Sequence, residues 1–233
     1  MSRPAANLTT RPLFGGAVIM DLPNEYIDAS DLRQIPDNQE VFLSHSSETS
    51  VVLEVLAMVQ DGLASTDLYE AVKFHFESIA HDNASLSSTI LTPPPSTPVL
   101  STPVDPATVT SYTPTPLILA GTQRIHKFSY NPTGAPRPGH ETDQPDEVWI
   151  AVALWRCWVE SAGPIAGEGE GAGAGAGAGE KKKKKADLVL SVNVNLSAED
   201  GKGQEERRWV EEWFARAVGS LRIEDWHLFG DSA

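Results

Sequence analysis

Acidic side chains gather in one short stretch of the chain, IDASDLRQIPDNQEVF, at residues 27–42. It contains one basic residue, Arg33, and four acidic ones, Asp28, Asp31, Asp37 and Glu40. Such residues could build a helix-capping turn, a metal site or a docking surface for a basic partner. The spacing is not that of a calcium-binding EF-hand loop, because no glycine occupies the turn and no glutamate closes a span of twelve residues. A capped turn and a docking surface therefore stay open.

The other reactive side chains form no catalytic pattern. The six histidines include no HExxH pair, and His75 falls on the apolar face of an expected helix, as a packed core histidine does. The only cysteine, Cys157, lies among tryptophans in an apolar run, which predicts a buried and inert thiol. Neither a GxxxxGK[ST] loop nor a GxSxG elbow occurs. We therefore expect no catalytic residue, no metal and no cofactor.

The charge balance limits the partners. The 233 residues carry a formal net charge of −14, from 18 Lys and Arg against 32 Asp and Glu. So acidic a chain repels phosphate backbones, which argues against binding to nucleic acid and favours basic protein surfaces. The apolar run at residues 13–20 is too short to span a membrane and no cleavage pattern follows it. A soluble intracellular monomer is the expectation.

Turns and strands alternate around the acidic stretch. Residues 13–22 resemble the start of a strand or hairpin, in which two adjacent glycines permit a bulge. The segment SDLRQIPD predicts one helical turn that Ser30 or Asp31 caps and Pro36 ends. Extended structure resumes at residues 40–44, and the Val- and Leu-rich residues 50–59 predict a buried strand.

Two amphipathic helices and further strands follow. DLYEAVKFHFESIA predicts a helix that Asp67 and Glu70 begin as a capping box. Residues 148–160 are apolar on both faces until Arg156, as expected of a strand covered on both sides. Leu188 to Leu196 alternate cleanly, and Gly219 is placed to end the last helix. The apolar stripe of that helix consists of Trp209, Val210, Trp213, Phe214, Ala217 and Val218.

Two low-complexity insertions interrupt this pattern. Residues 92–116 are rich in proline, and residues 161–186 contain a Gly/Ala tract followed by five lysines. Neither can bury an apolar face, so both are expected to be solvated. The lysines are also a candidate nuclear-localisation signal. Residues 1–233 then form one domain with an α/β fold, a three-layer α/β/α sandwich on a mainly antiparallel sheet.

Three pieces of sequence add a family resemblance. LFGGA at residues 13–17, the stretch D-x-S-D-L-R-x-x-P-D-x-Q-E-V-F and the helix AVKFHFESIA resemble the Ran guanine-nucleotide release factors, the Mog proteins. VALWRC, DLVLSVNVNL and the terminal IEDWHLFG fit as well. The resemblance covers residues 13–230 apart from the two insertions.

The resemblance implies a fold, a partner and a surface. The fold would be the α/β/α sandwich that this family shares with the PsbP proteins. The function would be binding to the small GTPase Ran and promotion of nucleotide release, in support of nuclear protein import, with the protein in nucleus and cytoplasm. A PsbP-like structural or assembly subunit without GTPase activity is the alternative. The positions that match the family's acidic Ran-facing surface are Asp28, Asp31, Asp37 and Glu40, with Glu54 added from the next strand.

Overall fold

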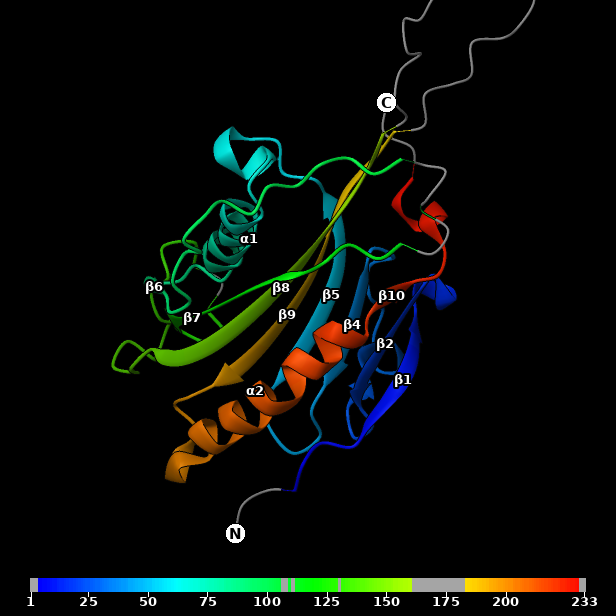
Figure 1. Ribbon diagram of the computed structural model, residues 1–233. Coiled ribbons are helices and arrows are strands. Elements are labelled where there is room, and N and C mark those ends of the chain that lie inside the picture. Colours follow the sequence, from blue (N-terminus) through cyan, green and yellow to red (C-terminus); the bar gives the residue numbers. More distant parts are fainter. Residues whose placement is uncertain (1–3, 106–108, 110–111, 130, 161–182, 231–233) are drawn as a thin grey trace, which may run out of the picture.

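An antiparallel sheet of seven strands, in the order β3-β4-β5-β9-β8-β7-β6, organises the protein. The computed structural model describes residues 4–105, 109, 112–129, 131–160 and 183–230. A second sheet has three strands in the order β1-β2-β10. The predicted α/β fold on an antiparallel sheet is confirmed, and Figure 1 shows its two helices, α1 and α2, beside the large sheet.

The element bounds follow the chain. The strands are β1 Leu8–Leu13, β2 Val18–Pro23, β3 Ile27–Asp28, β4 Gln39–Leu43, β5 Ser50–Ala57, β6 Ser87–Ile90, β7 Leu117–Ile125, β8 Asp146–Glu160, β9 Lys183–Asn195 and β10 Arg222–Ile223. The α-helices are α1 Leu68–Asp82 and α2 Lys202–Ser220. Short 3-10 turns are η1 Phe14–Gly16, η2 Ala29–Asp31, η3 Gly62–Ser65, η5 Glu199–Gly201 and η6 Trp226–Phe229.

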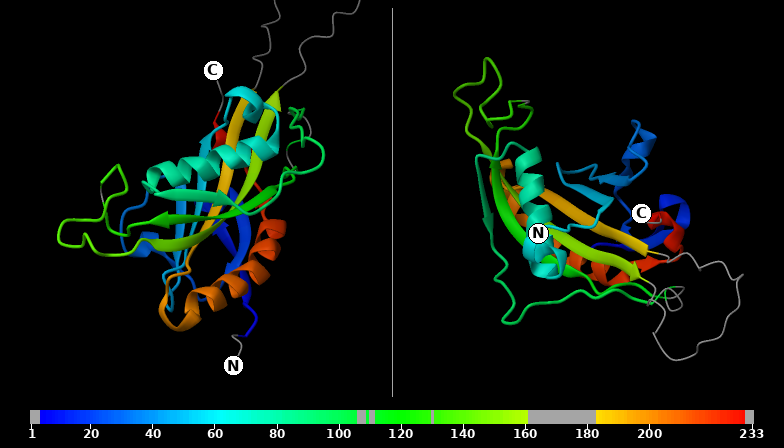
Figure 2. Two further views of the ribbon diagram at one scale, coloured as in Figure 1. Left: turned by 90° about the vertical axis from the view of Figure 1, so that its left-hand side faces the viewer. Right: turned by 90° about the horizontal axis from the view of Figure 1, so that it is seen from above.

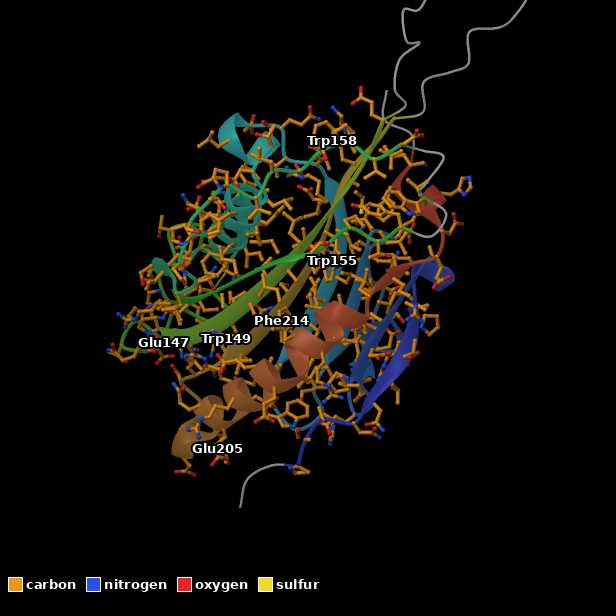
Figure 3. The ribbon with its side chains drawn as sticks, in the orientation of Figure 1. Glu147, Trp149, Trp155, Trp158, Glu205 and Phe214 are labelled. Atoms are coloured by element: carbon orange, nitrogen blue, oxygen red, sulfur yellow. The ribbon has the colours of Figure 1, made fainter. Side chains whose placement is uncertain are left out.

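Strand β8 is buried on both faces, as its composition predicted. Val148, Ile150, Val152 and Leu154 point into one apolar cluster, which α1 covers. The alternate residues, Trp149, Ala151, Ala153, Trp155 and Cys157, point into a second cluster with α2. Figure 3 shows Trp155 of β8 and Phe214 of α2 in this second layer. The sheet therefore separates two cores.

Helix α1 begins at its predicted cap. The Asp67 carboxylate accepts a hydrogen bond of 2.8 Å from the amide of Tyr69, which satisfies one of the unpaired N–H groups of the first turn. The helix packs on β7 and β8, where Gly121 leaves room for the ring of Phe76. A methyl group at Gly121 would lie 2.5 Å from the Cζ of Phe76 and 2.4 Å from the carbonyl oxygen of Thr89.

Helix α2 and the three-stranded sheet together cover the other face of the large sheet (Figure 2). The predicted apolar stripe of α2 is confirmed, since all six of its members are buried. The helix continues through Gly219 and ends at Ser220, so the prediction of a glycine cap there is wrong. The small sheet, which the sequence did not predict, joins residues from both ends of the chain.

The two predicted insertions differ in how much of them the structure describes. β9 begins at Lys183, where Lys183 pairs with Glu160 of β8, so the last lysines belong to a strand rather than to a loop. The Gly/Ala tract and the first two lysines, at residues 161–182, lie outside the described residues. The described part of the proline-rich segment is held against the body by bridges at Leu100 and Val104.

A buried ionic network fixes the path from β5 to α1. Asp187 on β9 pairs with Arg156 on β8 through two hydrogen bonds of 2.9 and 3.0 Å, and His75 of α1 lies 3.0 Å from the same carboxylate. Arg156 also donates to the carbonyl of Ala64, and Asp187 accepts from the amide of Val59. These contacts hold the pKa of Asp187 below its ordinary value, against the opposing effect of burial. His75 is thus a core histidine, as predicted, with an ionic partner that the sequence did not reveal.

Candidate docking surface

The acidic stretch folds into two turns on either side of a short loop at the β3–β4 edge of the large sheet. Asp28 ends β3 and caps η2, since its carboxylate accepts a 2.8 Å hydrogen bond from the amide of Ser30. The predicted turn therefore exists, but Asp28 caps it and not Ser30 or Asp31. Asp31 lies in the turn itself and its side chain is exposed. Exposure leaves the charge of Asp31 available to a partner.

Asp37 lies in the second turn. The amide of Gln39 donates a 2.9 Å hydrogen bond to the carbonyl of Pro36, which closes this turn just before β4. The carbonyl of Asn38 accepts from the amide of Val55, which ties the turn to β5. Asp37 itself is exposed. The turn thus presents its carboxylate next to the part of β5 that carries Glu54.

Glu40, which the resemblance places on the Ran-facing surface, points towards the LFGGA loop. Its side chain is half-buried and accepts a hydrogen bond from the amide of Phe14. Burial is the main cause that raises the pKa of Glu40, the hydrogen bond opposes it, and the nearby charge of Asp28 adds to it. Phe14 has φ 50°, an uncommon value for a residue with a side chain, and Gly15 follows with φ 66°. Glu40 therefore holds the LFGGA loop in a left-handed conformation.

Arg11, which the sequence did not single out, lies beside the start of the acidic stretch. It donates hydrogen bonds to the carbonyls of Pro23, Asn24 and Tyr26, the shortest of them 2.7 Å, and its guanidinium lies 5.1 Å from the centre of the Phe42 ring. Burial lowers the pKa of Arg11, and the charge of Asp28 acts in the opposite direction. Arg11 and Glu40 together fasten the small sheet to the edge of the large one. An isolated arginine in a strand gives no sequence signal for this role.

Glu54 projects from the opposite face of the sheet to Glu40. Residues directly opposite on antiparallel strands share a face, so Glu40 lies on the same face as Leu53, which belongs to the α2-covered core. Glu54 lies opposite Gln39 and accepts a hydrogen bond from its side-chain amide. The five predicted residues are thus divided: Asp28 and Glu40 shape the fold, whereas Asp31 and Asp37 are exposed in the β3–β4 connection and Glu54 lies on the neighbouring face of the sheet. We call Asp31, Asp37 and Glu54 the acidic rim.

A groove lined by both polar and apolar side chains continues from Glu54 across the face of the sheet that α1 leaves uncovered. It has a volume of about 330 Å³ and lies between the C-terminal end of α1, at Ile79 and Asn83, and strands β5 and β9. Its floor is polar because Ser191, Asn193 and Asn195 occupy alternate positions of β9 on this face. An open groove of mixed polarity beside exposed acidic side chains suits a protein partner.

Other kinds of site find no support in the described part of the chain. No cluster of three His, Cys, Asp or Glu residues there could hold a metal ion. Cys157 is fully buried, and burial raises the pKa of its thiol well above the ordinary value, so it is protonated and inert at neutral pH. No helix in the described residues is long and apolar enough to cross a membrane.

Comparison with known proteins gives a consistent result. A model of the family described as "Ran-interacting Mog1 protein" matches residues 11–162. The zebrafish Ran guanine nucleotide release factor is 40% identical over 82 residues, 34% of this chain and 41% of that protein. The nuclear import protein mog1 of Schizosaccharomyces pombe is 47% identical over 72 residues, 30% of this chain and 36% of that protein. The matches thus span less than half the length of these relatives.

A solved structure agrees at the level of the fold. The crystal structure of the Saccharomyces cerevisiae Ran-binding protein Mog1p superposes with a TM-score of 0.61 at 21% identity, over 97% of this chain and 100% of that one. Because the family model covers more than half of the 233 residues, including the whole acidic stretch, the chain belongs to the Mog1 family.

Proposed function

We propose that this protein binds the small GTPase Ran, promotes release of its guanine nucleotide and thereby supports nuclear protein import. The family match is the observation that carries the proposal, since it includes all of residues 27–54, from which every acid of the rim comes. The names of the relatives, a Ran guanine nucleotide release factor and a nuclear import protein, supply the activity and the process. The protein acts as a monomer in nucleus and cytoplasm.

The acidic rim is the proposed contact with Ran. Asp31 and Asp37 are exposed and Glu54 is half-exposed beside an open groove, so their charges reach a basic partner at little desolvation cost. Asp28 and Glu40 act indirectly in this proposal. Their carboxylates are engaged with the amides of Ser30 and Phe14, and they hold the loop that displays the rim.

Nucleotide release needs no chemical step from this protein. It follows if the protein binds nucleotide-free Ran more tightly than loaded Ran, because the two ligands of Ran then weaken each other reciprocally. A tenfold loss of nucleotide affinity requires about 1.4 kcal/mol of coupling. A few charge-assisted hydrogen bonds supply that amount.

The test is a release assay with purified Ran that carries a fluorescent guanine nucleotide. The protein should accelerate the fluorescence decay in proportion to its concentration, up to saturation. The control is bovine serum albumin, another acidic protein, at the same concentrations. An unchanged decay rate, together with no complex on gel filtration with nucleotide-free Ran, would refute the proposal.

A further inference from the structure

The proline-rich segment is a strap that backbone hydrogen bonds hold across the molecule. We define the strap as Thr92–Asp105, which runs from β7 past the start of α1 to the end of β8 (Figure 1). The amide of Thr92 donates to the carbonyl of Ala120 at 3.1 Å. Further along, the Val99 carbonyl accepts from the amide of Leu68 at 2.8 Å, and the Val104 amide donates to the carbonyl of Trp158 at 2.9 Å.

One part of the strap, which we call the arc, makes none of these backbone hydrogen bonds. Residues 93–98, PPPSTP, are all exposed. Within the described part of the chain, no hydrogen bond involves these six residues, whereas both ends of the arc are fixed at Thr92 and Val99. The arc is therefore an accessible peptide held at two points on a rigid body.

The strap and the residues after it contain every Thr-Pro step of the chain, at Thr92, Thr97, Thr102, Thr113 and Thr115. Two of these hydroxyl groups are engaged as acceptors. The Thr92 oxygen accepts a 2.8 Å hydrogen bond from the amide of Ala120, and the Thr113 oxygen accepts a 3.0 Å bond from the amide of Ile223. Neither threonine can leave its position without the loss of a backbone partner.

Two more are exposed, but fixed neighbours restrain them. Thr102 lies between Ser101, whose amide donates to Thr66 at 2.8 Å, and the bonded Val104. Thr115 follows the buried Pro114 and precedes β7 by one residue. Thr97 is the one member of the five for which the residue itself and both of its neighbours, Ser96 and Pro98, are exposed.

We propose that Thr97 is a phosphorylation site for a proline-directed serine/threonine kinase. Such an enzyme binds its acceptor as an extended peptide, and a following proline biases threonine towards that conformation in advance. The Thr97 oxygen attacks the γ-phosphorus of ATP, the bond from that phosphorus to the β–γ bridging oxygen breaks, and ADP leaves. The hydroxyl proton passes to a base of the kinase. This site is independent of the proposed contact with Ran.

The fold tolerates the phosphate at this position. Thr97 is exposed, and the described residues give its hydroxyl no hydrogen bond that a phosphate would break. The carbonyl two residues later, on Val99, accepts from the first amide of α1, and this anchor does not involve the Thr97 side chain. The melting temperature of the phosphorylated protein should therefore not fall.

The experiment compares the five acceptors within one molecule. The full chain is incubated with a purified mitogen-activated protein kinase and MgATP, and initial rates at each threonine are measured by peptide mass spectrometry. Thr97 should react at least about tenfold faster than each of the other four, because these are restrained by their own hydrogen bonds or by anchored or buried neighbours. A synthetic peptide of residues 92–116, in which all five are free, should lose this selectivity.

Two variants serve as matched controls. Thr97→Val should remove most of the phosphate that the folded protein incorporates, whereas Thr113→Val should leave incorporation unchanged. Similar rates at all five threonines of the folded chain would overturn the proposal, as would reaction at Thr97 in the peptide alone. Failure of both the peptide and the folded chain to react, with a kinase that is active on a standard substrate, would overturn it as well.

Discussion

Burial raises the pKa of the Glu40 carboxylate and the hydrogen bond from Phe14 lowers it, and the effect of burial is the larger. The raised pKa means that the folded protein binds the proton of Glu40 more tightly than the unfolded chain does. The contribution of Glu40 to stability is therefore fully present below the ordinary glutamate value of 4.5 and is lost as pH rises through the folded-state pKa.

Glu40→Gln should remove this pH dependence. We expect the stability of the wild type to fall relative to that of the variant as pH rises from 4 through the folded-state pKa, and the difference to become constant above it. Urea unfolding of both proteins at a series of pH values measures the difference, in which the other carboxylates cancel. A difference that does not vary with pH would contradict the burial of Glu40.

Asp28 and Asp31 allow a direct comparison of two neighbouring aspartates. Asp28→Ala removes the cap of η2 and should cost about 1 kcal/mol of unfolding free energy. Asp31→Ala removes an exposed side chain that caps nothing and should change stability by less than about 0.5 kcal/mol. Equal losses in urea unfolding would show that the cap assignment is wrong.

Among the elements, those with a regular apolar pattern were predictable, whereas their higher-order pairing was not. The apolar stripe of α2 and the doubly buried β8 follow from periodicity alone. The small sheet was missed because β10 has two residues and pairs with β2 from the far end of the chain, which no local pattern reveals. The acidic stretch was recognised, but the inward turn of Glu40 depends on the distant Phe14 amide.

The Arg156–Asp187 pair joins β8, β9, α1 and the loop before α1, so its loss should be severe. Arg156→Met leaves the fully buried Asp187 without its strongest partner and should cost about 3–5 kcal/mol. Lys73→Met, which breaks the exposed Glu70–Lys73 pair on α1, should cost less than about 0.5 kcal/mol. Urea unfolding of both variants checks the contrast, and a loss below about 1 kcal/mol in Arg156→Met would show that the network is dispensable.

Two glycines test the packing of the helices. Gly121→Ala forces a methyl group against the Phe76 ring and the Thr89 carbonyl, so it should destabilise by about 1–3 kcal/mol. Gly219→Ala lies in α2 with no atom within 4 Å of the new methyl group, and should stabilise by up to about 1 kcal/mol. The melting temperatures of the two variants should therefore shift in opposite directions from that of the wild type. A stable Gly121→Ala variant would mean that α1 does not lie against β7 as described.

At the scale of the whole molecule, the apolar cores that stabilise the fold and the acidic rim lie in different places. Two apolar cores on either side of the large sheet hold the framework, and the α2 side is closed by the small sheet. The acidic rim lies where the β3–β4 connection meets β5, beside the part of the sheet that α1 leaves open. A net charge of −14 adds a long-range attraction to basic partners, and salt should screen it.

The docking of Ran to the acidic rim is the central claim, and reversal of two of its charges tests it most directly. Asp37→Lys with Glu54→Lys changes the net charge by +4 without touching Glu40 or either core. Glu211→Lys with Glu212→Lys makes the same change on the exposed side of α2 and serves as the control. Circular dichroism should show that both variants are folded.

The measurement is the rate of fluorescent nucleotide release from Ran at a fixed concentration of each protein. The rim variant should stimulate nucleotide release at least about tenfold less than the wild type does, because repulsion replaces attraction at the contact. The α2 control should keep nearly all of its activity, apart from a modest loss through net charge. A folded rim variant that stimulates release at the wild-type rate would contradict the account, and so would equal losses in the two variants.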